Sequence, residues 1–200
     1  MLTKIAIKVT NNLIENHIIS KEDFELYSFG LKSSLIIAIN IIVTLIIGFS
    51  LRMPIESLLI LVVFIPLRSC AGGIHASNNT LCLFISALMI VSILIFTKWL
   101  LLYFTLNLTL MTVVGLVAAV ITFILAPVQD ANKPLNANEA QLFKKRTLKV
   151  LFAEISFLII MLCFRIDTVV LVIALTLCIV CLSVCAGAVK NMIDRKFISN

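Results

Sequence analysis

His75 and Cys82 are the residues best suited to covalent chemistry, and both lie in a short polar segment between long apolar runs. The segment covers residues 68–82 and reads RSCAGGIHASNNTLC. A cysteine thiolate is a strong nucleophile and histidine is the usual base that generates it, so the pair is suited to nucleophilic catalysis, with Cys82 as the attacking thiolate and His75 as base and later acid. A metal site made of Cys70, His75 and Cys82 is the alternative use of these side chains. Because no second cluster of ligands accompanies them, we expect no metal and no other cofactor.

The spacing of this pair requires the chain to turn between its members. On a continuous α-helix they would share a face but stand about 10 Å apart along the axis, whereas a general base works at about 3 Å. Residues 77–80, Ser-Asn-Asn-Thr, favour turns and helix caps. The sequence therefore favours a fold-back over a pair shared between two protomers. A helix that starts at Asn79 or Thr80 would hold Cys82 in its first turn, where free N–H groups stabilise anions.

Each candidate residue also has a purely structural interpretation. A cysteine in an apolar helix is commonly a small packing residue, and a histidine near a membrane interface is commonly a hydrogen-bonded loop residue. Gly72 and Gly73 provide either a close approach for substrate or a simple hinge. Glu56 and Glu154 lie in apolar runs, where an ionisable group marks a functional site or extends to the interface.

The composition is that of an integral membrane protein. Hydrophobic residues make up 62% of the chain, charged residues 13%, and the mean hydropathy is +1.17. Lys4 and Lys8 interrupt the N-terminus too early for a cleaved export signal. Four of the six cysteines lie in apolar runs, so no disulfide framework is predicted. Three of these four follow each other at helical spacing, which indicates helix packing rather than redox chemistry, namely Cys178, Cys181 and Cys185.

The predicted fold is all-α and forms one membrane domain over residues 1–200. Within it, residues 1–30 form an amphipathic N-terminal region, because Leu2, Ile5, Val9 and Leu13 recur at helical spacing in an interfacial helix. Ser20 and Asp23 then resemble a capping box that starts the next helix. About six spans follow, in the apolar runs Leu31–Phe49, Pro54–Leu67, Leu81–Leu102, Leu108–Val128, Leu148–Phe164 and Thr168–Val189.

The apolar runs differ in length. Residues 81–128 are more than twice the length needed to cross about 30 Å of hydrocarbon, so they predict a hairpin of two spans. Pro54–Leu67 is the weakest candidate, because as a helix it reaches only about 20 Å.

The distribution of charge predicts the topology. With six spans and a cytoplasmic N-terminus, thirteen of the sixteen Lys and Arg residues fall on the cytoplasmic side, and only Arg52, Lys98 and Arg165 on the other. We therefore expect a multi-pass protein of the cell membrane with both termini, the segment 68–82 and a basic loop over residues 129–147 in the cytoplasm. No nucleic-acid partner is expected.

The segment 68–82 resembles the signature of the AgrB family, the accessory gene regulator membrane endopeptidases of Gram-positive quorum sensing. A second run, APVQDANKPL at residues 126–135 followed by Lys144, Lys145 and Arg146, resembles the loop after that family's fourth span. The two motifs occur in the family's order, and the length and number of spans agree as well. The resemblance thus covers essentially the whole chain.

The resemblance implies a cysteine endopeptidase with His75 and Cys82 as its catalytic pair and Arg68, Gly72 and Gly73 in supporting positions. Its substrate would be a small AgrD-type precursor peptide, whose retained part becomes a cyclic thiolactone or lactone signal. Homodimerisation is also implied. The basic residues Lys133, Lys144, Lys145 and Arg146 are candidates for holding an acidic tail of the precursor, although a topology signal explains them equally well.

No third residue that orients His75 can be assigned, since Asn78, Ser77, Glu56 or a backbone carbonyl could each serve. A non-enzymatic membrane transporter, exporter or binder of a signal peptide is the alternative function. Such a protein should tolerate Cys82→Ser, whereas thioester chemistry should not.

Overall fold

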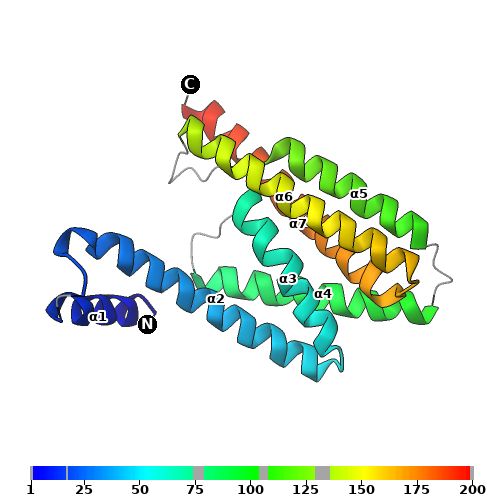
Figure 1. The fold of residues 1–200 in the computed structure, drawn as a ribbon, viewed down its shortest axis with the longest axis horizontal. Coiled ribbons are helices and arrows are strands. Elements are labelled where there is room, and N and C mark those ends of the chain that lie inside the picture. The colour runs from blue at the N-terminus through cyan, green and yellow to red at the C-terminus, as the bar shows by residue number, and fades with distance from the viewer. Residues whose placement is uncertain (1, 17, 74–78, 104–107, 129–135, 199–200) are drawn as a thin grey trace.

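The computed structural model describes residues 2–16, 18–73, 79–103, 108–128 and 136–198, and these fold into helices (Figure 1). Apart from the short 3₁₀ turn η1 (Lys21–Asp23), the elements are α-helices: α1 (Leu2–Glu15), α2 (Phe24–Ser50), α3 (Pro54–Ala71), α4 (Asn79–Tyr103), α5 (Leu108–Leu125), α6 (Ala137–Cys163) and α7 (Asp167–Ile198). No strand occurs in the described part of the chain. The all-α prediction is confirmed.

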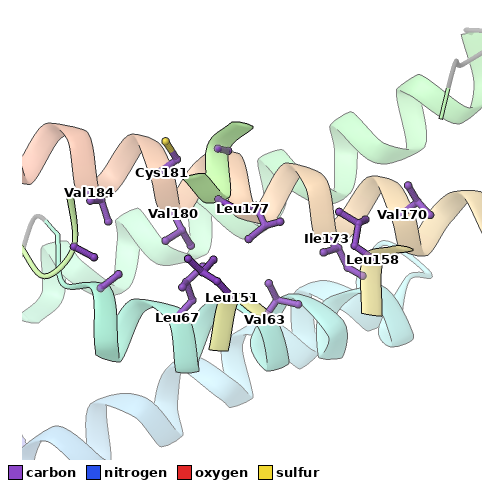
Figure 2. Close-up of a cluster of buried hydrophobic side chains, with 14 residues drawn as sticks. Val63, Leu67, Leu151, Leu158, Val170, Ile173, Leu177, Val180, Cys181 and Val184 are labelled. Carbon is purple, nitrogen blue, oxygen red and sulfur yellow. The ribbon is translucent and has the colours of Figure 1, made fainter. Parts of the chain in front are cut away.

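Helix α7 forms the centre of the bundle and packs against α3, α4, α5 and α6. Five of its fully buried residues recur at intervals of three and four and therefore share one face, namely Val170, Ile173, Leu177, Val180 and Val184. Figure 2 shows Val180 of α7 pointing toward Leu67 of α3 and Leu151 of α6. Helix α5 approaches α7 closely at Gly115, where an added Cβ would lie 3.1 Å from Ala174. Small residues allow this approach in a membrane protein, where tight packing drives helix association.

Five of the described helical stretches are long and apolar enough to cross a membrane. The predicted class, a polytopic membrane protein, agrees with this finding, but the count of six is not confirmed. The remaining candidate run lies in α6, which ends at Cys163 and is not among these five. It also contains Lys149 and Glu154. The predicted hairpin over residues 81–128 is present as α4 and α5.

Helix α3 is longer than the sequence analysis predicted. It continues through Arg68 to Ala71, and its 18 residues reach about 27 Å. The drop in hydropathy at Arg68 does not end the helix, because residues 68–71 are compatible with helical backbone. Gly72 ends it instead, with φ 75° and ψ −147°. The polar segment thus leaves α3 four residues later than expected.

The N-terminal helix α1 packs along the start of α2 (Figure 1). Its most buried residues are Ala6 and Thr10, whereas Ile5 and Val9 of the predicted apolar face remain exposed on the flank. A new element does start at Ser20, but the predicted capping bonds are absent there. The Ser20 hydroxyl instead donates to the Asp23 carboxylate at 2.8 Å.

Candidate active site

The candidate site begins where α3 ends, at two consecutive glycines. Gly72 and Gly73 have φ values of 75° and 125°, a region that L side chains rarely adopt. Gly72 continues the hydrogen bonding of the helix, because its N–H donates to the Arg68 carbonyl at 3.2 Å. At Gly73 the chain has left the helix. The sequence left the purpose of the glycine pair open, and the structure uses it for a sharp change of backbone direction.

Arg68 holds this turn from within the last turn of α3. Its Nη1 donates to the carbonyl oxygen of Gly72, and the side chain is half-buried. An added Cβ on Gly73 would overlap the Arg68 guanidinium and would lie 3.1 Å from the Ser183 carbonyl of α7. Gly73 is therefore enclosed between α3 and α7, and only glycine fits there without a shift of its neighbours.

A segment from elsewhere in the chain meets this turn. The backbone N–H of Val128, just beyond α5, donates to the Ala71 carbonyl at 2.9 Å, and Gly72 and Val128 form an isolated parallel bridge. An added Cβ on Gly72 would overlap the Val128 carbonyl. The two sequence motifs that resemble the AgrB family are thus in direct contact at one end of the bundle. Both motifs are recognisable in the sequence, but their pairing is not, because nothing in a single sequence shows which distant backbone groups meet.

Cys82 lies near the start of α4, whereas His75, Asn78 and Lys133 lie outside the described residues. Helix α4 begins at Asn79, one of the two predicted starts, so Cys82 is its fourth residue and lies in its first turn. The first four N–H groups of an α-helix have no partner within the helix. The backbone at Cys82 is therefore part of the positive end of α4.

The basic residues after the second motif are helical, not in a loop. The predicted loop 129–147 is part of α6 from Ala137 onward, and the Asn136 N–H donates to the Glu139 carboxylate at 3.0 Å at the start of this helix. The Lys144 ammonium lies 5.2 Å from the centre of the Phe123 ring of α5. This cation–π contact places Lys144 near the end of α5 that leads to Val128.

The other two basic candidates also lie on α6. Arg146 lies 5.8 Å from the Phe143 ring, and Lys145 is exposed.

The two carboxylates in apolar runs have different surroundings. Glu56 is in the first turn of α3, about 24 Å along the helix from Gly72. Since three residues reach only about 10 Å, Glu56 of the same chain is too far away to orient His75. Glu154 of α6 is buried, and within the described structure neither of its carboxylate oxygens has a hydrogen-bond partner.

The cysteines that lie outside the polar segment show no arrangement of ligands for a metal. Cys181 and Cys185 place their sulfurs 4.0 Å apart on successive turns of α7, which the helical spacing alone explains. Within the polar segment, Cys70 is half-buried on the last turn of α3. Across the described residues, no group of three or more His, Cys, Asp or Glu side chains is placed to hold a metal ion.

These features define a class: a polytopic helical membrane protein in which the segments after α3 and α5 meet at one end of the bundle and a cysteine lies in the first turn of α4. A comparison with protein families identifies it further. The family described as Accessory gene regulator B (AgrB) matches residues 6–184, and the chain belongs to that family. Membership implies a role in processing autoinducer peptides, with an AgrD-type peptide as the substrate context. No curated protein and no solved structure matches the chain.

Proposed function

We propose that this protein is a membrane-embedded cysteine endopeptidase that cleaves an AgrD-type precursor peptide, with Cys82 as nucleophile and His75 as general base and acid. The observation that carries the proposal is the start of α4 at Asn79, which puts Cys82 in the first turn of a helix. Backbone N–H groups and the helix dipole at this position favour a thiolate and can bind the oxyanion of a tetrahedral intermediate. Family membership supplies the substrate class.

The first half of the reaction breaks the peptide bond. His75 takes the thiol proton of Cys82, and the thiolate attacks the scissile carbonyl to form a tetrahedral oxyanion. The intermediate collapses as its C–N bond breaks, and His75 returns the proton to the departing amine. The C-terminal fragment leaves, and the N-terminal part stays bound to Cys82 as an acyl-thioester.

The second half closes the ring. A cysteine or serine within the retained peptide attacks the thioester carbonyl, His75 accepts its proton, and the Cys82 sulfur departs. The products are a cyclic thiolactone or lactone and the regenerated enzyme. A thioester keeps the acyl group activated, so this exchange needs no other energy source. Apolar surroundings favour the internal nucleophile because they limit competing water.

The turn at the end of α3 serves this chemistry by fixing Gly72 and Gly73, which directly precede the part of the chain that contains His75. Arg68 holds the Gly72 carbonyl, and Gly73 fills a space that admits no side chain. Since Glu56 is too distant, Asn78, Ser77 or a backbone carbonyl remains to orient His75. Lys133, Lys144, Lys145 and Arg146 would attract an acidic tail of the precursor. The positive-inside rule assigns this end of the bundle and both termini to the cytoplasm, and the family resemblance implies a homodimer.

The test is mass spectrometry of a cognate precursor co-expressed with wild type, His75→Ala, Cys82→Ala or Cys82→Ser. We expect the released C-terminal fragment and the cyclised remainder with wild type only, while all variants remain in the membrane. An exporter or binder of the peptide would keep most of its activity as Cys82→Ser. Undiminished cleavage by Cys82→Ala would exclude the proposed mechanism.

A further inference from the structure

Two successive carbonyl groups at the end of α3 are each held by a donor. The Ala71 carbonyl accepts from the Val128 N–H at 2.9 Å, and the Gly72 carbonyl accepts from Arg68 Nη1. The last carbonyls of an α-helix have no partner within the helix. Here the Ala71 carbonyl is satisfied by a separate part of the chain, and the Gly72 carbonyl by a side chain of α3 itself.

The Val128 contact is anchored in the core of the bundle. Ala71 is fully buried, Ala126 is 3% exposed, and both belong to the apolar cluster that joins α3, α5, α6 and α7. Val128 is half-buried and packs against the same cluster. The Val128 N–H is therefore held in place by the same packing that fixes α5 against α7.

We propose that the backbone N–H of Val128 is a positioning group for the catalytic segment, a role that rests on the proposed peptidase function. It touches neither substrate nor reacting atoms. It fixes the end of α3, and Gly72 is three residues before His75, a distance of about 10 Å at most in extended chain. Because so little chain separates the two residues, a displacement or rotation of Gly72 also displaces His75. Misplacement of a catalytic group by about 1 Å can cost on the order of 100-fold in rate.

The proposal also gives the second family motif a function. Its first residues, Ala126 to Val128, hold the first motif in place through the backbone, so the identity of the side chain at position 128 matters less than its N–H. Val128→Ala keeps the donor, whereas Val128→Pro removes it. The two variants form a matched pair that separates the hydrogen bond from the packing.

The experiment measures kcat and KM for precursor cleavage by full-length protein in nanodiscs, for wild type, Val128→Ala, Val128→Pro and Cys82→Ala. A parallel set, with Cys82 as the sole cysteine, gives the rate of Cys82 alkylation. Thermal unfolding of each variant reports the fold. We expect Val128→Pro to lose on the order of 10- to 100-fold in kcat, with KM close to that of Val128→Ala and a somewhat lower unfolding temperature, because the Ala71 carbonyl loses its donor. Its alkylation rate should differ from that of Val128→Ala, which should behave as wild type.

Equal kcat values for the two Val128 variants would overturn the proposal. If Val128→Pro fails to fold, hydrogen exchange of the Val128 amide in the wild type tests the proposal instead. The Val128 amide should be as well protected as the amides of α3, and exchange as fast as that of a solvent-exposed amide would overturn the proposal. Cleavage by Cys82→Ala would instead refute the peptidase function, and it would leave the expected protection of the Val128 amide unchanged.

Discussion

Arg68 donates from its guanidinium to the carbonyl oxygen of Gly72, across the point where α3 ends. The interaction joins a charged donor to a backbone acceptor, so it is stronger than a bond between neutral groups. It also explains why a charged residue is half-buried at the end of an apolar helix. The guanidinium caps the helix and covers Gly73 at the same time.

Arg68→Lys should therefore impair cleavage although it keeps the positive charge. Lysine has one flexible ammonium in place of a planar fork, so it cannot reproduce the contacts of Arg68 with both glycines. A hydrogen bond to a charged group contributes about 1.5–3 kcal/mol, which corresponds to roughly a 10- to 100-fold loss of kcat/KM. Kinetics of precursor cleavage in nanodiscs measure the effect. Lys98→Ala, at the far end of α4, is the control and should retain full activity.

Gly73→Ala should abolish most of the activity, because the new Cβ meets the Arg68 guanidinium and the backbone has a φ of 125°. Backbone strain of this kind costs about 1–3 kcal/mol even before the overlap is counted. Gly30→Ala is a matched control, since a Cβ there meets nothing within 4 Å. Within α2 that change should leave cleavage intact and raise helix stability by up to about 1 kcal/mol. Equal activity of the two variants would contradict the close packing at Gly73.

Glu154→Met should stabilise the protein. The carboxyl group is buried without a partner among the described residues, and an unsatisfied buried polar group costs about 1–3 kcal/mol. Methionine is unbranched and fills a similar volume. Thermal unfolding in detergent should show a higher midpoint than wild type. Cleavage should be unchanged, and a lower midpoint or lost cleavage would show that Glu154 has a partner or a role that this packing does not account for.

Lys145→Glu should weaken binding of the precursor more than it slows the chemistry. Lys145 is exposed on α6, next in sequence to Lys144, which contacts α5. Reversal of its charge should raise KM for a precursor with an acidic tail and leave kcat nearly unchanged. The effect should diminish in high salt, which screens exposed charges. A precursor whose tail is neutralised is the control, and a KM equally raised for that peptide would contradict an electrostatic role.

Much of this fold could be predicted from the sequence because it depends on local patterns. Apolar runs located the helices, and the turn-forming residues 77–80 predicted a helix start at Asn79 or Thr80, the first of which is where α4 begins. The end of α3 was harder, because helical backbone persists beyond the drop in hydropathy at Arg68 and stops only at the positive φ of Gly72.

The remaining features depend on tertiary contacts. The hydrogen bond between Val128 and Ala71 joins segments far apart in the chain. The burial of Glu154 depends on which face of α6 meets α3, α5 and α7. Neither relationship has a signature in local periodicity.

The central claim, covalent catalysis by Cys82, is tested most directly by trapping the acyl-enzyme. The cognate precursor would carry alanine in place of its internal cysteine or serine, so that the ring cannot close. Intact-mass spectrometry of the protein in nanodiscs should then show a mass gain equal to the retained N-terminal part, lost on treatment with hydroxylamine and absent from Cys82→Ala and His75→Ala. Release of the C-terminal fragment without any adduct, or an adduct that persists in Cys82→Ala, would contradict the account.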